Sequence, residues 1–138
     1  MTTFSTVALF GANGQIGTCI LQALLGCKKQ SFEVTCFIPP DSPAPPSATD
    51  LSNVHIREID LTKTSKEELG KVLKGIDVVV SALNGPALEA QYKIQDAAAD
   101  VGVKRYYPSE YGMHHIYRKP DDPQGYMHPV RKAIPPAI

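Results

Sequence analysis

The stretch Gly11-Ala12-Asn13-Gly14-Gln15-Ile16-Gly17 decides how this chain is expected to fold. It follows the apolar run 7–10, which indicates a buried strand, and it leads into 15–25, where apolar residues recur at helical spacing. Glycines spaced GxxGxxG between a strand and a helix are a variant of the fingerprint of dinucleotide-binding turns. The alternative is that they only make a tight strand-to-helix turn.

Each glycine has a physical role in such a turn. Gly11 permits the tight turn out of the strand, Gly14 lets backbone N–H groups approach a pyrophosphate, and Gly17 allows close packing of the helix. Asn13 tolerates unusual backbone angles or reaches a phosphate with its amide. The helix N-terminus adds unpaired N–H donors and the positive end of the helix dipole, so we expect it to bind the pyrophosphate.

The rest of the chain alternates strand-like and helix-like segments. In chain order we expect a strand at 33–38, a strand at 54–59, a helix at 64–73, a strand at 76–82, a helix at 86–101 and a strand at 103–107. The prolines of 39–53 make a regular helix there improbable. Strands that alternate with helices imply a parallel sheet covered by helices.

These patterns predict an α/β fold, a Rossmann-like doubly wound parallel sheet of about five strands. The NAD(P)-binding domain is expected over residues 1–112, followed by an irregular, proline-rich tail over 113–138. After residue 107 the strand and helix pattern ends, and residues 113–138 show no sustained period.

Composition excludes several classes of protein. The 138 residues carry 14 basic and 14 acidic side chains, so a neutral chain has no bulk electrostatic reason to seek nucleic acid or an anionic membrane. No apolar run is long enough to span a bilayer, and the N-terminus does not resemble a secretory signal. Three cysteines without a CxxC pair indicate reduced thiols, and we expect a cytoplasmic protein.

Two acidic residues follow strands whose ends should meet the adenosine. Asp41 follows the second strand, as a ribose ligand or as a solvated turn residue. Asp60 follows the third strand, as an acceptor for the adenine amino group or as a cap of its own turn. No metal is expected, because His114, His115 and His128 lack ligand spacing.

Several segments together resemble the NmrA-like and isoflavone reductase-like family of atypical short-chain dehydrogenases/reductases. The segments that carry the resemblance are 11–17, 78–83, Gln91 and Lys104-Arg105-Tyr106-Tyr107-Pro108-Ser109-Glu110-Tyr111-Gly112. The resemblance covers residues 5 to about 130, and the segments 114–120 and 125–129 are similar to a filamentous-fungal branch.

This resemblance implies an NADP-binding Rossmann domain followed by a smaller substrate domain. It also implies an oxidoreductase that transfers hydride between a nicotinamide cofactor and a small organic substrate. The cofactor-binding residues that it implies are Gly11, Asn13, Gly14, Gln15 and Ile16 at the pyrophosphate, Ser81, Ala82 and Leu83 along the cofactor, and Pro108, Ser109 and Glu110 near the nicotinamide.

The sequence also departs from the family pattern. Pro39 stands where reductases of the family carry an arginine for the 2′-phosphate, so both NADP and NAD remain open as cofactors. Lys132 is the one candidate for the family's catalytic lysine, and it is otherwise an exposed tail residue. Because the chain ends soon after, we expect the C-terminal substrate domain to be missing, in a truncated form, an altered splice product or a shortened gene model.

Two other classes of function stay open. One is a catalytically inactive, dinucleotide-sensing regulatory protein, and the other is a non-functional fragment. The expected partners are a dinucleotide and a small-molecule substrate, with no nucleic acid and no membrane. An uncovered sheet edge at the fifth strand predicts self-association.

Overall fold

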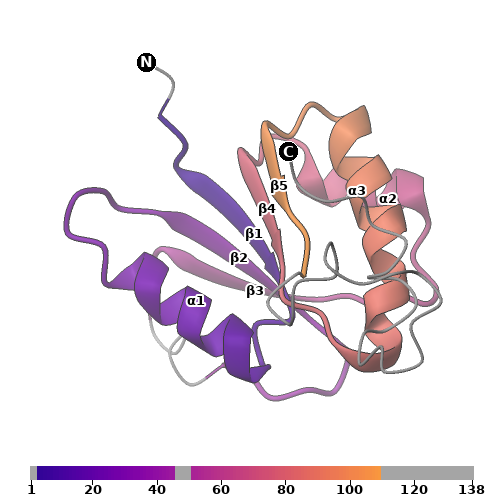
Figure 1. Cartoon of the computed structure of the whole chain (residues 1–138), viewed down its shortest axis with the longest axis horizontal. Helices are drawn as coiled ribbons and strands as arrows, with labels where there is room; N and C mark the ends of the chain where they lie inside the picture. The colour runs from indigo at the N-terminus through magenta and orange to yellow at the C-terminus, as the bar shows by residue number, and fades with distance from the viewer. Residues whose placement is uncertain (1–2, 46–50, 110–138) are drawn as a thin grey trace, which may run out of the picture.

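The computed structural model describes residues 3–45 and 51–109, in which one parallel sheet carries helices on both faces (Figure 1). Its elements are β1 (Thr6–Phe10), α1 (Gln15–Leu25), β2 (Glu33–Ile38), β3 (Val54–Glu58), α2 (Lys66–Leu73), β4 (Val78–Ser81), the 3₁₀ helix η2 (Gly85–Ala90), α3 (Gln91–Asp100) and β5 (Arg105–Tyr107). The expected tail 113–138, with Lys132 and the three histidines named above, lies outside these residues, as does Glu110.

The sheet has the strand order β3-β2-β1-β4-β5, and every neighbouring pair is parallel. From β1 the chain builds outward through β2 to β3, then returns to the other side of β1 and adds β4 and β5. The Rossmann-like parallel sheet predicted from the alternating pattern is therefore confirmed.

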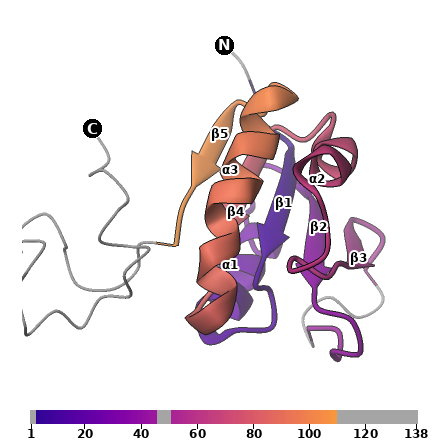
Figure 2. The same cartoon turned by 90° about the vertical axis from the view of Figure 1, so that its right-hand side faces the viewer.

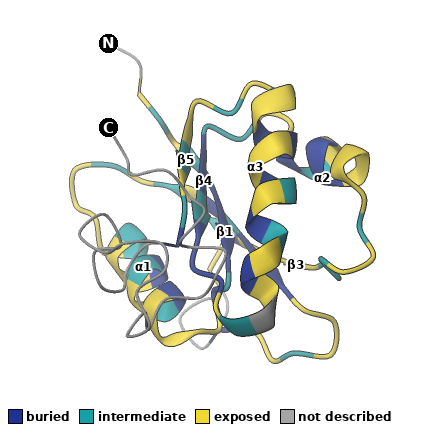
Figure 3. Ribbon diagram, turned by 45° about the vertical axis from the view of Figure 1, so that its right-hand side comes forward, coloured by how far each residue is buried: buried dark blue, intermediate teal, exposed yellow. Residues whose placement is uncertain are grey.

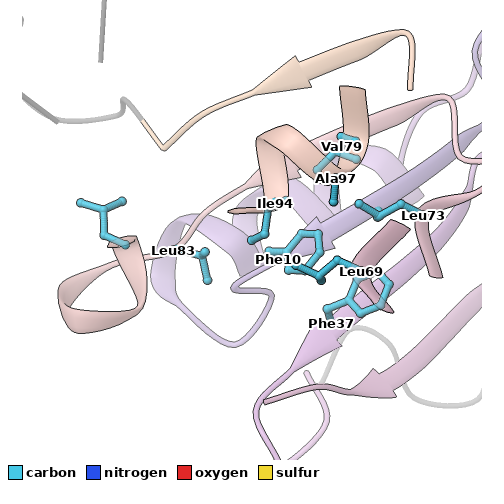
Figure 4. Packing of buried hydrophobic residues seen from close by; sticks show 11 residues of the cluster. Phe10, Phe37, Leu69, Leu73, Val79, Leu83, Ile94 and Ala97 are labelled. Carbon is cyan, nitrogen blue, oxygen red and sulfur yellow. The ribbon is translucent and has the colours of Figure 1, made fainter. Parts of the chain in front are cut away.

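Each face of the sheet has its own hydrophobic core. Leu21 of α1 packs with Leu9 and Cys36 on one face, and Figure 1 places α1 alone on that side. Leu69 of α2 and Ile94 of α3 pack on the other face (Figure 4). Figure 3 shows that the buried residues of α3 lie on its side toward the sheet.

Phe10 and Phe37 form the aromatic centre of the second core. Their rings stack with centroids 4.6 Å apart, and neither side chain is more than 2% exposed. Complete burial of such a side chain contributes about 1.5–3 kcal/mol. Phe10 is the last residue of β1, and Phe37 lies next to the end of β2. Their stacking therefore fixes the strand ends that border the pocket described below.

Helix α2 begins with a capping box formed by Ser65 and Glu68. Ser65 Oγ accepts the Glu68 N–H at 3.1 Å, and Glu68 Oε2 accepts the Ser65 N–H at 3.4 Å. Two donors that a helix start would leave unpaired are thereby satisfied. The preceding residue, Thr64, donates its hydroxyl to the Asp60 carbonyl oxygen at 2.7 Å.

The single helix expected over 86–101 is divided in the structure. A 3₁₀ helix runs over Gly85–Ala90, and the α-helix begins only at Gln91. Asn84 caps the 3₁₀ helix, since its Oδ1 accepts the Gly85 N–H at 2.9 Å. Tight 3₁₀ turns are frequent at the N-termini of α-helices, and the apolar spacing of the sequence does not distinguish the two.

Strand β5 is shorter than predicted and forms one edge of the described sheet. It begins at Arg105 instead of Val103, because the N–H groups of Lys104 and Arg105 both donate to the Asp77 carbonyl oxygen before the ladder starts. Tyr107 is 53% exposed at this edge. Self-association through β5 remains a prediction, which size-exclusion chromatography tests.

The three cysteines are free thiols, as the odd count and spacing predicted. Cys19 and Cys27 are exposed, whereas Cys36 is buried in β2. Burial raises the pKa of the Cys36 thiol to about 11, so this group stays protonated and packs as a small apolar side chain.

Candidate dinucleotide site

A pocket of about 570 Å³ opens where the carboxyl ends of the central strands meet. The segments after β1, β2, β3 and β4 all contribute to it, together with η2 and the first turn of α3. The strand order reverses between β1 and β4, and such a switch point is where open α/β sheets bind their ligands. The position of the pocket thus follows from the order of the strands.

Two glycines of the glycine loop pack too closely at the switch point to carry a side chain. Gly11 has φ +83°, and a Cβ there would stand 2.6 Å from the Ala82 carbonyl oxygen, which leaves no room for any side chain. A Cβ on Gly17 would stand 2.0 Å from the Gly11 carbonyl oxygen. Both glycines are therefore required by packing, Gly11 against the end of β4 and Gly17 between α1 and the turn.

Gly14 meets a different requirement. It is the N-cap of α1 with φ −76° and ψ 170°, a conformation open to any residue, and a Cβ there would meet only the Gly11 carbonyl oxygen at 3.4 Å. No side chain of the described residues caps this helix start. The first N–H groups of α1 have no partner within the helix, and an anion at Gly14 would satisfy them.

The loop between β3 and α2 forms the opposite wall. Asp60 Oδ1 accepts the Thr62 hydroxyl at 2.6 Å and the Thr62 N–H at 3.0 Å, and these bonds hold the pKa of the Asp60 carboxyl below its usual value. Asp60 thus caps its own turn and also lines the pocket. The role of Asp60 as a cap of its own turn is therefore compatible with a role as an acceptor for the adenine amino group.

Asp41 lies outside the pocket lining. The Ser42 N–H donates to the Pro39 carbonyl oxygen at 3.3 Å, and Asp41, with φ +63°, occupies the third position of this turn. Positive φ at that position is the mark of a type II turn, and proline is favoured before it. Pro39 and Pro40 line the pocket in its place, which favours the turn alternative for Asp41.

Ser109 is almost fully buried behind the pocket. Its hydroxyl donates to the Leu83 carbonyl oxygen at 2.8 Å, and its N–H donates to Gln91 Oε1 at 2.6 Å. The end of β5 is thereby bonded to the segment after β4 and to the first residue of α3. Ser109 holds a wall of the pocket in place from behind.

The structure brings together about half of the predicted cofactor residues. Those that line the pocket are Gly11, Asn13, Gly14, Asp60, Ala82 and Leu83. Gln15 and Ile16 are exposed on the first turn of α1, outside the lining, while Gly17, Ser81 and Ser109 are buried and Pro108 is half-buried. The sequence reasoning missed Lys93, which lines the pocket from α3, because a lone lysine in a helical pattern carries no signal.

Comparison with known proteins fixes the family. The family model described as the NmrA-like family matches residues 3–134. The chain belongs to the NmrA-like family. The resemblance stated from the sequence motifs is confirmed, and it extends over nearly the whole chain.

Similar proteins include plant and fungal enzymes. The chain is 31% identical over 122 residues to isoeugenol synthase 1 of Clarkia breweri, covering 85% of this chain and 38% of that protein. It is 29% identical to asnovolin J 5′,6′-dehydrogenase of Aspergillus novofumigatus, covering 82% of this chain and 35% of that protein. The chain therefore spans little more than a third of the length of these curated relatives.

Solved structures of reductases are also similar to this chain over part of their length. The binary complex of leucoanthocyanidin reductase and NADPH from Vitis vinifera matches with a TM-score of 0.67 at 27% identity, covering 86% of this chain and 40% of that one. An isoflavone reductase structure matches with a TM-score of 0.66 at 26% identity, covering 88% of this chain and 41% of that one.

No helix within residues 3–45 and 51–109 has the length and apolar character needed to cross a membrane. The same residues contain no cluster of three potential metal-ligating side chains.

Proposed function

We propose that the pocket binds a nicotinamide dinucleotide and that the chain provides the cofactor-binding part of an NAD(P)-dependent oxidoreductase. The observation that carries this proposal is the contact between Gly11 and Ala82, in which no side chain fits between the glycine loop and the end of β4. This contact places the open N-terminus of α1 at the pocket, where a pyrophosphate would accept its N–H groups.

The remaining walls suit the adenosine half of such a ligand. Phe37, Ile38, Ile59 and Leu61 offer apolar surface to an adenine ring, and Asp60 places a carboxylate beside them. Ligand pockets commonly combine apolar walls with a few polar groups that set orientation. The volume of about 570 Å³ lies within the usual range for small-molecule and cofactor sites.

The bound cofactor would supply the hydride, and the protein would bind and orient it. In this account Gly14 leaves room for the pyrophosphate, Asp60 accepts from the adenine amino group, and Ala82 and Leu83 border the cofactor along the end of β4. The substrate is a small organic molecule. The relatives named as a dehydrogenase and as a reductase with bound NADPH support this reaction class.

A dinucleotide-sensing protein without turnover is the second candidate. One observation among the described residues favours it. Ser109, at the expected nicotinamide end, is buried, and its hydroxyl donates to the Leu83 carbonyl oxygen. A hydroxyl held in this way has a structural role and is not offered to a substrate. The non-functional fragment is a third alternative, which differs from both in binding no dinucleotide.

Isothermal titration with NADH and with NADPH tests the proposal. We expect one dinucleotide per chain, and absence of binding for both would contradict the proposed function. Incubation of the complex with candidate carbonyl and alkene substrates then separates the first two alternatives, because only the oxidoreductase consumes the reduced cofactor.

A further inference from the structure

Lys93 links α3 to the loop that forms the far wall of the pocket. Its Nζ lies 2.5 Å from the Leu61 carbonyl oxygen and 2.7 Å from the Thr64 carbonyl oxygen. Both carbonyls belong to the segment between β3 and α2, which also carries Asp60. Figure 2 shows α2 and α3 side by side, which brings the loop that leads into α2 close to α3.

The other hydrogen bonds of this loop are local, and Leu61 also packs against the hydrophobic core beneath α2 and α3. The N–H groups of Lys63 and Thr64 donate to the Asp60 carbonyl oxygen at 3.1 and 2.9 Å. These local bonds set the shape of the turn but do not fix its distance from α3. The Lys93 ammonium adds the polar link between this wall and α3.

The position of this charge is unfavourable for α2 itself. Thr64 directly precedes Ser65, the N-cap of α2, and the N-terminus of a helix is the positive end of its dipole. None of the ion pairs among the described residues includes Lys93. A half-buried cation at this place without a carboxylate is better explained by a ligand than by the stability of the helix.

Lys93 also lines the pocket directly, next to Leu61 and Ala90. A lysine ammonium has three N–H donors, and the two carbonyl oxygens occupy two of them. The third donor is thus left for a ligand in the pocket. The oxygens and ring nitrogens of an adenosine are acceptors of the required kind.

We propose that Lys93 is a binding and positioning residue for the adenosine half of the dinucleotide. It holds the 60–64 loop at the correct distance and donates its remaining N–H to a ring nitrogen or hydroxyl oxygen of the adenosine. This inference rests on the proposed function. It predicts that replacing Lys93 weakens binding of the adenosine half of the ligand only. A general effect on folding would weaken binding of both halves.

The test uses Lys93→Met, which retains the length of the side chain and removes the ammonium. The matched control is Lys71→Met, at an exposed lysine of α2. NADH is bound first, and 5′-AMP and nicotinamide mononucleotide are titrated separately to displace it, with the fluorescence of bound NADH as the readout. All measurements are made below the onset of unfolding, which circular dichroism establishes for each variant.

We expect Lys93→Met to raise the inhibition constant of 5′-AMP by about tenfold, the loss of one hydrogen bond to a charged group. The constant for nicotinamide mononucleotide should not change, and Lys71→Met should change neither. An unchanged constant for 5′-AMP, or an equal rise for both ligands, would overturn the inference. If wild-type protein does not bind NADH, the proposed function itself fails.

A second variant covers the case in which Lys93→Met does not fold. Lys93→Gln retains an N–H donor for the loop carbonyls but removes the positive charge and shortens the reach into the pocket. We expect it to fold and still to bind 5′-AMP more weakly than wild type. Wild-type affinity for 5′-AMP in this variant would overturn the inference.

Discussion

The Lys104 ammonium lies 3.0 Å from Oδ1 of Asp77, an ion pair between the segments that enter β5 and β4. The other carboxylate oxygen, Oδ2, accepts the N–H groups of Ser5 and Thr6 at 2.9 and 3.2 Å. One carboxylate thereby joins the amino ends of three strands. The pocket lies at the carboxyl ends of the same sheet, so the stability of the sheet and the binding of a ligand can be changed separately.

Asp77 predicts how stability depends on pH. The Ser5 N–H, the Lys104 ammonium and the Thr6 N–H hold the pKa of the Asp77 carboxyl well below its usual value. A group whose pKa is lowered on folding stabilises the protein above the unfolded pKa of about 4, and this contribution is lost as the pH falls toward the folded pKa. We expect Asp77→Asn to lower the melting temperature at pH 7 and to flatten its decline below about pH 5.

Asp100→Asn is the matched control for this experiment. Asp100 also pairs with a lysine, Lys66, at 3.1 Å, but both side chains are largely exposed and such surface pairs add little to stability. The control should leave the melting curve nearly unchanged at each pH. Equal curves for Asp77→Asn and wild type would show that the carboxylate does not join the strands as described.

The glycine loop predicts opposite outcomes at two of its positions. Gly14→Val should fold normally, since a Cβ there meets only the Gly11 carbonyl oxygen at 3.4 Å, but the valine methyl groups would occupy the pyrophosphate position. We expect dinucleotide affinity to fall by more than about tenfold with little change in melting temperature.

Gly17→Val should instead destabilise the fold, because its Cβ would stand 2.0 Å from the Gly11 carbonyl oxygen. Thermal unfolding and isothermal titration of both variants separate the two effects. Unchanged affinity in Gly14→Val would refute the assignment of the phosphate site.

Cofactor choice should depend on Pro39. The turn after β2 presents two prolines to the pocket and no guanidinium, so we expect the chain to distinguish NADPH from NADH only weakly. Charge-assisted hydrogen bonds contribute about 1.5–3 kcal/mol each. Pro39→Arg should therefore tighten NADPH binding by about tenfold to a hundredfold and leave NADH binding unchanged.

Titration of both cofactors checks this prediction. A strong NADPH preference in the wild-type protein would contradict it. In that case Lys63, whose ammonium lies 3.9 Å from Asp60 Oδ2 and whose side chain is 85% exposed, would be the base to replace next.

Ser109 should matter for stability. Ser109→Ala removes the donor to the buried Leu83 carbonyl oxygen, and loss of a partner for a buried group costs about 1–3 kcal/mol. Urea denaturation measures the difference in free energy of unfolding, with Ser52→Ala at an exposed turn as control. If both variants unfold at the same urea concentration as wild type, the hydrogen bond from Ser109 to Leu83 does not stabilise the wall of the pocket.

Much of the fold could be predicted from local patterns. The Val run of β4 indicates a strand that is covered on both faces, and Ser65 with Glu68 marks a helix start through bonds made within four residues. The 3₁₀ segment before α3 was not predictable in this way. Apolar residues recur similarly in both helix types, and the spacing does not reveal the cap that Asn84 forms on the first turn.

The site was only partly predictable for a related reason. Gly11 and Gly14 carry their own signal because the turn requires them. The role of Lys93 depends on α3 lying next to a loop about thirty residues earlier, which only the folded chain shows. Asp41 was a candidate by position alone, and the turn from Pro39 to Ser42 keeps it out of the pocket lining.

The central claim is that a dinucleotide binds at the carboxyl ends of β1 and β4, with its pyrophosphate on the N-terminus of α1. Backbone amide NMR of ¹⁵N-labelled protein, titrated with NADH, tests it most directly. The account predicts the largest shifts at Gly14, Gln15 and Ile16, with further shifts at Leu61 and Leu83. Shifts confined to the opposite end of the sheet, around Ser5 and Lys104, or no shifts at all, would contradict it.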